Sequence, residues 1–423
     1  VMEAIQNGVF ILSGGPGTGK TTTINTIIRY FEREGYDIYL AAPTGRAAQR
    51  MTEATGFEAR TIHRMLELNG ALSDENKRSV RFERNAENPL EADVIIIDEM
   101  SMVDLPLFQA LLKAIMPGTR LIMVGDVNQL PSVGPGQILR DIMRSEAYPT
   151  VVLQKIFRQA GESDIVVNAH HINRGEQIEL NNKSKDFFFL ERNDVQVIYK
   201  HMIQLIRDKL PKYVNATSYD IQVLTPMRKG TLGVQNLNAV LQETLNPAAF
   251  DKREVHFRQI VFREGDKVMQ IKNNYNVVWK CYDCKSGKRY DEGLGVYNGD
   301  AGIILSIDND AEQMRVAFDD GKIVDYDFAN LEELELAYAI TIHKSQGSEY
   351  PVVILPVYSG PPMLMTRNLL YTAVTRAKQL VVLVGLRETV SAMIHNDREV
   401  GRYTGLAQRI QNLHDFMHGG DIL

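Results

Sequence analysis

Residues 9–31 have the sequence VFILSGGPGTGKTTTINTIIRYF, and this stretch carries the strongest fold signal in the 423-residue chain. It begins with the apolar run VFIL, typical of a buried strand, and continues directly into GGPGTGKTT, residues 14–22, which satisfies the pattern GxxxxGK[ST]. Ile24, Ile27 and Phe31 then recur at helical spacing. A glycine-rich loop between a strand and a helix predicts a phosphate-binding loop in an α/β fold, and these flanks argue against a chance glycine-rich turn.

The chemistry of this loop points to a nucleotide. Glycines let backbone N–H groups converge on phosphate oxygens at a helix N-terminus, where the helix dipole also favours negative charge. Lys20 would reach the β- and γ-phosphates and Thr21 would ligate Mg²⁺, so ATP and Mg²⁺ are the expected cofactors. The residues expected to bind the nucleotide here are Gly15, Pro16, Gly17, Thr18, Gly19, Lys20, Thr21 and Thr22.

A pair of acidic residues follows a second apolar run, residues 94–97. Asp98 and Glu99 would stand at the C-terminal end of a buried strand, where open α/β sheets bind their ligands. Asp98 would hold Mg²⁺ through its outer coordination sphere, and Glu99 would orient or deprotonate the attacking water. The alternative is a solvated acidic pair at a strand end. Together with the phosphate loop, the pair predicts nucleotide hydrolysis.

Six further segments distinguish this chain from kinases, GTPases and transporters, which also use phosphate loops. They are PTGRAA (43–48), ARTIHRML (59–66), LIMVGDVNQLPSVG (121–134), IFRQ (156–159), TIHKSQGSEY (341–350) and YTAVTRAK (371–378). In this order they resemble the motifs of superfamily 1 helicases. GGPGTGKTT, DEMSMVD, GDVNQLPSVGPG and HKSQGSEY are similar to those of RecD-type members of the 5′-to-3′ branch, and the resemblance covers almost the whole chain.

The resemblance implies an ATP-dependent DNA helicase that moves 5′ to 3′ along single-stranded DNA and unwinds duplex, in recombination or repair. Gln129 follows a predicted strand and can sense the γ-phosphate or its water. Arg158 and Arg376 are planar donors suited to the charge of a transferring phosphoryl group, although an isolated arginine is as often a surface ion pair. The expected catalytic residues are Lys20, Asp98, Glu99, Gln129, Arg158 and Arg376.

The same resemblance implies three more nucleotide contacts. Phe157 would stack on the adenine, Glu349 would accept a hydrogen bond from the ribose, and Gly347 belongs to the same set. The family also places a glutamine ahead of the phosphate loop to read adenine, but Gln6 is too close to the loop to match it. The chain starts at Val1, without an initiator methionine, in a predicted helix, so we expect a fragment whose upstream part carries that glutamine.

A nucleic-acid strand would cross the other face of the two motor domains. The hydroxyl and positive groups of the matching motifs suit contacts to phosphates, which carry little sequence information. A metal site at His63 and His343 is the alternative, but no carboxylate or thiol shares their spacing. The residues expected to contact the strand are Pro43, Thr44, Arg46, Thr61, His63, Thr341, His343 and Lys344.

The expected partners are single-stranded DNA and junctions between single strand and duplex, with subunits of a recombination complex as further candidates. We expect the motor to work as a monomer. Two alternatives stay open: the same engine could act on RNA, since no residue tests for a 2′-hydroxyl, or the chain could be an ATP-gated DNA-binding subunit that does not unwind DNA by itself.

The expected architecture is α/β, with two RecA-like domains that carry two insertions. The first motor domain covers 1–150, and its polar stretch at about 68–90 is either a mobile loop or, as the resemblance implies, a β-hairpin pin that splits the duplex. The second motor domain covers 151–249 and 334–423. Residues 250–333 alternate apolar and polar positions between tight turns, which fits the SH3-like β-barrel of the family.

Composition sets broader limits. The chain is 44% apolar and has neither a run of eighteen apolar residues nor a signal peptide, so we expect a cytoplasmic protein that does not enter the membrane. A net charge of −6 argues against a generally basic surface, although motors often confine positive charge to a groove. Cys281 and Cys284 form the only CxxC, and because two more zinc ligands are missing nearby we interpret them as incidental thiols.

Overall fold

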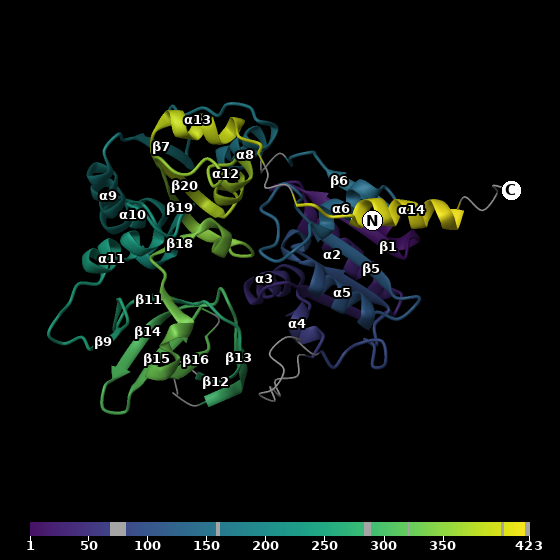
Figure 1. Ribbon diagram of the computed structural model, residues 1–423, viewed down its shortest axis with the longest axis horizontal. Helices are drawn as coiled ribbons and strands as arrows, with labels where there is room; N and C mark the ends of the chain where they lie inside the picture. The colour runs from purple at the N-terminus through teal and green to yellow at the C-terminus, as the bar shows by residue number, and fades with distance from the viewer. Residues whose placement is uncertain (68–81, 158–160, 283–288, 320, 399–401, 419–423) are drawn as a thin grey trace.

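The computed structural model describes residues 1–67, 82–157, 161–282, 289–319, 321–398 and 402–418. Two units built on parallel sheets lie side by side, and antiparallel strands form a third body below one of them (Figure 1). We call the body around the six-stranded sheet the first unit, the body around the five-stranded sheet the second unit, and the antiparallel strands the insertion. The α/β class with parallel sheets is confirmed.

The first unit has a fully parallel sheet in the order β3-β2-β4-β5-β1-β6. Its strands are β1 (Val9–Gly14), β2 (Ile38–Ala42), β3 (Ala59–Thr61), β4 (Val94–Ile97), β5 (Arg120–Gly125) and β6 (Thr150–Leu153). Its helices are α1 (Met2–Gln6), α2 (Lys20–Arg33), α3 (Gly45–Thr55), α4 (Ile62–Met65), η1 (Met100–Met102), α5 (Leu105–Ala114) and α6 (Ile138–Ser145).

Burial explains why these segments form this sheet. Strand β4 consists of Val94 and three isoleucines that are all fully buried, because helices cover both faces of a parallel sheet. Helix α2 buries Ile24, Ile27 and Phe31 on one face, as their spacing predicts. The strand, loop and helix expected around the phosphate loop are therefore present, and the loop is held at the C-terminal end of β1.

One boundary differs from the expectation. Strand β6 pairs in parallel with β1, Ile11 opposite Thr150 and Gly14 opposite Leu153, so the first unit extends past residue 150. The short apolar segment TVVL can pair with either sheet by its sequence. The free edge of β1 provides the partner, and only the packed structure shows this.

The second unit has a parallel sheet in the order β18-β8-β19-β20-β7. Its strands are β7 (Phe187–Glu191), β8 (Ile221–Thr225), β18 (Ala339–Thr341), β19 (Tyr350–Val357) and β20 (Ala377–Gly385). Its helices are α8 (Asp164–Arg174), α9 (Val195–Gln204), η2 (Leu205–Lys209), α10 (Leu210–Val214), η3 (Ser218–Asp220), α11 (Val234–Leu245), η5 (Ile342–Ser345), α12 (Arg367–Val374) and α13 (Arg387–His395).

The insertion leaves the second unit after α11 and returns to it at β18. A two-stranded sheet is formed by β9 (Glu254–Phe257) and β10 (Ile260–Arg263). A seven-stranded antiparallel sheet has the order β13-β12-β16-β15-β14-β11-β17. Its strands are β11 (Lys267–Gln270), β12 (Asn274–Tyr282), β13 (Arg289–Val296), β14 (Ala301–Asp308), β15 (Gln313–Phe318), β16 (Ile323–Asp327) and β17 (Leu334–Leu336). The helix η4 (Phe328–Glu333) connects β16 to β17.

The C-terminal helix α14 (Leu406–His418) corrects a second boundary, since we expected it in the second motor domain. It lies beside α6 of the first unit (Figure 1). Leu406 and Ile410 pack against the buried core of that unit, so apolar burial holds the end of the chain there. The chain therefore crosses from the second unit back to the first after α13.

Three expectations fall wholly or partly outside the described residues. Most of the expected hairpin arm lies there, as do Arg158 and Cys284. Cys281 is described and is a buried free thiol. In the part of the chain that the structure describes, no helix combines the length and the apolar character that a membrane span requires.

Candidate functional site

The phosphate loop connects the end of β1 to the start of α2. The Lys20 ammonium group donates hydrogen bonds to the carbonyl oxygens of Gly14, at 2.5 Å, and Gly15, at 3.0 Å. The Thr18 hydroxyl donates to the same Gly15 carbonyl at 2.8 Å. Gly19 has a φ of 88° at the helix N-cap, a conformation that glycine adopts without strain. The Lys20 ammonium group is thus bound to the phosphate loop that the sequence predicts.

Phe157 lies against this loop from the segment that follows β6. Its backbone N–H donates to the Gly17 carbonyl at 3.2 Å, and a Cβ built on Gly19 would lie 2.3 Å from its ring. The ring is 57% exposed, so one face is open to a stacking partner. On the other side of the loop, His170 of α8 contacts the Pro16 carbonyl at 3.1 Å. The structure therefore brings together the loop, the predicted aromatic residue and a histidine that the sequence did not indicate.

The two acidic residues follow β4 as expected. Burial, and then the negative charge of Glu99, raise the pKa of Asp98 to about 6, while the nearby Lys20 acts in the opposite direction. An Asp98 carboxylate oxygen accepts the Glu99 backbone N–H at 2.8 Å. Glu99 has a φ of 55°, in the left-handed region, which is uncommon outside glycine and is found at functional sites where the surroundings hold it.

Arg50 of α3 connects this acidic pair to the second unit. Its guanidinium forms an ion pair with Glu349 and lies 3.8 Å from Glu99. Lys378 lies 3.6 Å from the other Glu349 carboxylate oxygen. Glu349 is therefore held by two cations. Arg50 was not among the residues expected from the sequence; the available signal was its place one helical turn after Arg46 on the same helix.

A second connection between the units is formed at the end of β5. The Tyr371 hydroxyl donates to Asp126 at 2.6 Å, and the Gln129 side-chain amide lies 3.5 Å from the same carboxylate oxygen. The backbone N–H of Leu130 donates to the Thr372 hydroxyl at 3.1 Å. Gln346 donates to the Leu130 carbonyl at 2.7 Å. Both backbone groups of the residue after Gln129 are thus held by the second unit.

Arg376 is buried beside this connection. One of its terminal nitrogens donates to the Ser348 carbonyl at 3.2 Å, while its buried Nε has no hydrogen-bond partner among the described residues. The buried side-chain oxygen of Gln129 is also without a partner there. Buried polar atoms that lack partners are uncommon in folded proteins and are candidates for ligand contact. Gly347, in contrast, lies against Thr44, since a Cβ there would be 2.5 Å from the Thr44 hydroxyl.

The predicted strand-contacting threonines all stand at helix starts. The hydroxyls of Thr44, Thr61 and Thr341 accept backbone N–H groups at the N-caps of α3, α4 and η5. N-capping stabilises a helix without any ligand, and each hydroxyl keeps a proton that it can donate. Burial lowers the pKa of both His63 and His343, so both imidazoles are neutral at pH 7. In the described ranges no cluster of three metal-ligating side chains is present.

Arg46 reaches from α3 to the insertion. Its guanidinium lies 2.5 Å from Asp319, and it also donates to the hydroxyls of Ser348, at 3.3 Å, and Tyr350, at 3.4 Å. A cavity of about 320 Å³ opens here between α3, β3 and the insertion. Four basic residues line it, Arg46, Arg60, Arg64 and Lys322, together with two acidic ones, Asp300 and Asp319.

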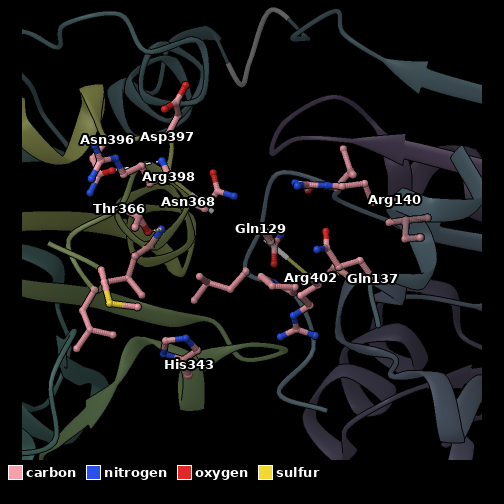
Figure 2. Close-up of a pocket in the computed structure, with 18 residues that line it drawn as sticks. Gln129, Gln137, Arg140, His343, Thr366, Asn368, Asn396, Asp397, Arg398 and Arg402 are labelled. Atoms are coloured by element: carbon pink, nitrogen blue, oxygen red, sulfur yellow. Dashed lines mark hydrogen bonds between the residues drawn. The ribbon is translucent and has the colours of Figure 1, made fainter. Parts of the chain in front are cut away.

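A second cavity, of about 290 Å³, lies between the two units, and Figure 2 shows the side chains that line it. The first unit contributes Gln129 and Arg140, and the second contributes His343 and Asn368. Arg402, from the segment before α14, lines the same cavity as Gln129 (Figure 2). Side chains from distant parts of the chain therefore line one space next to the expected γ-phosphate sensor.

Three protein families match parts of the chain. Residues 1–135 match the family described as AAA domain, residues 237–318 match the ATP-dependent RecD-like DNA helicase SH3 domain, and residues 336–384 match the UvrD-like helicase C-terminal domain. The second match covers much of the insertion, and the third covers β18, β19 and most of β20.

Whole-chain relatives agree with these matches. The ATP-dependent RecD2 DNA helicase of Deinococcus radiodurans is 34% identical over 402 residues, which are 95% of this chain and 50% of that protein. The RecBCD enzyme subunit RecD of Mycolicibacterium smegmatis is 31% identical over 442 residues, with 96% of this chain and 73% of that protein covered. This chain thus spans half of the first relative. A solved structure of Pif1 helicases at forked duplex DNA shares the fold, with a TM-score of 0.52, 21% identity, and coverage of 99% of this chain and 96% of that chain.

Proposed function

Because the chain belongs to the RecD family of DNA helicases, we propose that it hydrolyses ATP between its two α/β units and uses this cycle to move along single-stranded DNA and open a duplex. The observation that carries the proposal is the division of one site between two bodies. Lys20 and Asp98 come from the first unit, and Tyr371 and Arg376 come from the second. A nucleotide held between two bodies couples its hydrolysis to their relative movement.

The residues of the site divide the chemistry among them. The Lys20 ammonium exchanges the Gly14 and Gly15 carbonyls for phosphate oxygens. Glu99 orients the attacking water and accepts its proton, while the bond between the γ-phosphorus and the bridging oxygen breaks to release ADP and phosphate. Gln129 contacts the water or the γ-phosphate, and the unpaired Nε of Arg376 donates to the charge that develops there.

The donor set also suits Mg²⁺. Asp98 carries a pKa of about 6 because it is half-buried and lies beside another carboxylate, a charge pattern that a bound cation relieves. The Thr21 hydroxyl and the Asp98 carboxylate supply the oxygen donors that Mg²⁺ prefers. The ion would neutralise charge on the phosphates when bound.

The strand path lies on the faces that bear Arg46, Thr61 and His63 in the first unit and His343 and Lys344 in the second. Two observations support this path: the cavity beside Arg46, where basic side chains outnumber acidic ones, and the cavity between the units that His343 lines. Hydroxyl, imidazole and guanidinium donors suit phosphates and do not read base sequence. A path across both units lets relative movement of the units advance the strand.

Several finer assignments complete the proposal. The strand moves 5′ to 3′ through a single copy of the chain. The insertion closes as an SH3-like barrel beside the strand, as the matching family implies. The segment around residues 68–90 acts as the arm that separates the two strands, and Phe157 covers the adenine.

The decisive experiment measures ATP-dependent unwinding of two partial duplexes, one with a 5′ single-stranded tail and one with a 3′ tail. We expect only the 5′-tailed duplex to open, and a matched RNA tail tests the choice of nucleic acid. Opening of only the 3′-tailed duplex would contradict the proposed direction. If neither opens although single strands stimulate hydrolysis, the chain is a translocase that does not unwind DNA by itself. A hydrolysis rate indifferent to single strands would reject the motor altogether.

A further inference from the structure

Arg402 binds the loop that follows Gln129. One terminal nitrogen of its guanidinium donates to the carbonyls of Gly134 and Gly136, both at 2.6 Å, and to the Ser132 hydroxyl at 3.2 Å. The other terminal nitrogen donates to the Ser132 carbonyl. Arginine suits this task because its rigid planar fork presents several donors at once. One side chain thus contacts main-chain carbonyls along the loop that connects β5 to α6.

Arg402 belongs to the segment that returns from the second unit to the first. Before this segment, the Asn396 side chain donates to the Pro362 and Met365 carbonyls of the second unit, each at 2.8 Å. After it, the Thr404 hydroxyl contacts Asp141 of α6 at 2.5 Å, and α14 packs on the first unit. Arg402 therefore stands where the chain joins the two units.

The other end of the same loop is held by the second unit. Leu130 is bonded through its N–H to Thr372 and through its carbonyl to Gln346. Gln129 precedes it, with a buried side-chain oxygen that has no hydrogen-bond partner among the described residues. The position of Gln129 thus depends on a loop whose two ends are fixed by the later part of the chain, at Leu130 and at the three carbonyls that Arg402 binds.

We propose that Arg402 is a positioning residue for hydrolysis: it fixes the loop 130–136, and through that loop it keeps Gln129 at the γ-phosphate. This inference rests on the proposed function, since it assigns Gln129 to the phosphate. Both terminal nitrogens of Arg402 donate to this loop, so its role in hydrolysis is indirect. Loss of its guanidinium therefore lowers the rate of the chemical step and leaves nucleotide binding at the phosphate loop intact.

The test compares Arg402→Ala with Thr404→Val in the full chain, by measuring kcat and KM for ATP in strand-stimulated hydrolysis. Thr404→Val removes the hydroxyl that donates to Asp141 of α6 and accepts the Leu406 N–H, but it leaves the loop contacts, so it controls for attachment of the segment. We expect about a tenfold lower kcat and a KM within about twofold for Arg402→Ala. For Thr404→Val, both kcat and KM should stay within about twofold of the wild-type values. Millimolar guanidinium should restore part of the rate of Arg402→Ala but not that of Lys20→Ala.

Three results would overturn the inference. They are an unchanged kcat for folded Arg402→Ala, an equal loss of kcat in Thr404→Val, and a rate loss that guanidinium does not reduce. If Arg402→Ala does not fold, Arg402→Lys carries the test, because it keeps the charge but loses the fork, and a wild-type kcat there contradicts the inference. Failure of the proposed function looks different: wild-type hydrolysis would then show no response to single strands.

Discussion

The hydroxyl of Tyr371, on helix α12 of the second unit, donates a 2.6 Å hydrogen bond to the carboxylate of Asp126, at the end of strand β5 in the first unit. Both side chains are buried, each with only 1% exposed. Burial, and then the Asp126 charge, raise the pKa of Tyr371 well above its usual value, so the phenol keeps its proton and remains the donor. Tyr371 also lies against Gly15 of the phosphate loop. This bond joins the two units at the proposed nucleotide site.

We predict that Tyr371→Phe weakens the joined arrangement of the units. A hydrogen bond to a charged group contributes roughly 1.5–3 kcal/mol, so its loss should lower strand-stimulated kcat on the order of tenfold. The matched control is Tyr358→Phe, which removes an exposed hydroxyl that donates to the Asn193 carbonyl at 3.1 Å within the second unit. Hydrolysis of Tyr371→Phe at the control rate would show that the bond has no part in the cycle.

We predict that Lys20→Ala abolishes hydrolysis. Its ammonium group is the only side-chain cation that the described contacts place on the phosphate-loop carbonyls, and its removal should lower the rate by at least about a hundredfold. Lys113→Ala, on the exposed face of α5, controls for loss of a lysine. The measurement is phosphate release with saturating single strand. Robust turnover of Lys20→Ala would refute the assigned site.

We predict that Asp319→Asn tightens binding of single-stranded DNA several-fold at low salt. Asp319 lies 2.5 Å from Arg46 and occupies a guanidinium N–H donor of Arg46. In the proposed strand path, that donor would bind a DNA phosphate. The control is Asp325→Asn, which neutralises another paired carboxylate of the insertion, 2.6 Å from Arg315. The measurement is the Kd for an oligonucleotide with fluorescence anisotropy.

A double-mutant cycle separates a specific effect of Asp319 from a general change of charge. In a chain that already carries Arg46→Gln, Asp319→Asn should leave the Kd unchanged, because the donor that it frees is absent. An equal tightening in that background, or in Asp325→Asn, would indicate general electrostatics and argue against competition for Arg46.

We predict an unusual pH dependence of stability from Lys267, which is 9% exposed on strand β11. Burial lowers its pKa from 10.5 to about 8 in the folded chain, with Asp319 acting in the opposite direction. Between these values the unfolded chain binds more protons, so this lysine lowers stability at pH 7 and the loss disappears as the pH rises toward 10.5.

Lys267→Met should therefore be more stable relative to the wild type at pH 7 than at pH 10.5, with a difference of about 3 kcal/mol between the two comparisons. The variant also loses the hydrogen bond from Lys267 to the Tyr219 carbonyl. This loss lowers the stability of the variant at both pH values, so it does not affect the difference between them. Urea denaturation of the wild type and of Lys267→Met at pH 7 and pH 10.5 measures the free energies of unfolding. A relative stability that is the same at both pH values would mean that folding leaves the pKa of Lys267 at its ordinary value.

Much of the first unit could be predicted because its signals are local. A strand, a glycine loop and a helix follow one another within residues 9–31, and the chemistry of the loop depends only on that order. Asp98 and Glu99 were found in the same way, directly after a run of four buried residues. Each of these signals is local along the chain, whereas the assembled sheet brings the ends of β1 and β4 together.

The boundaries were less accessible, for a physical reason. Strand β6 pairs with β1, and the partner of a short apolar strand is set by which sheet edge is free. Helix α14 presents an amphipathic face that either unit could bury, and the packed structure places it on α6. Local periodicity predicts that a helix or strand forms, but it does not predict which element that helix or strand packs against.

The sequence by itself determined the family, the α/β class and the phosphate loop, since each depends on residues close together in the chain. Only the tertiary structure decided the contacts between the units: Tyr371 with Asp126, 245 residues apart, and Arg402 with Ser132, 270 residues apart. No period or motif encodes such pairs, because their distance depends on how two separately formed sheets pack and on where the chain crosses between them.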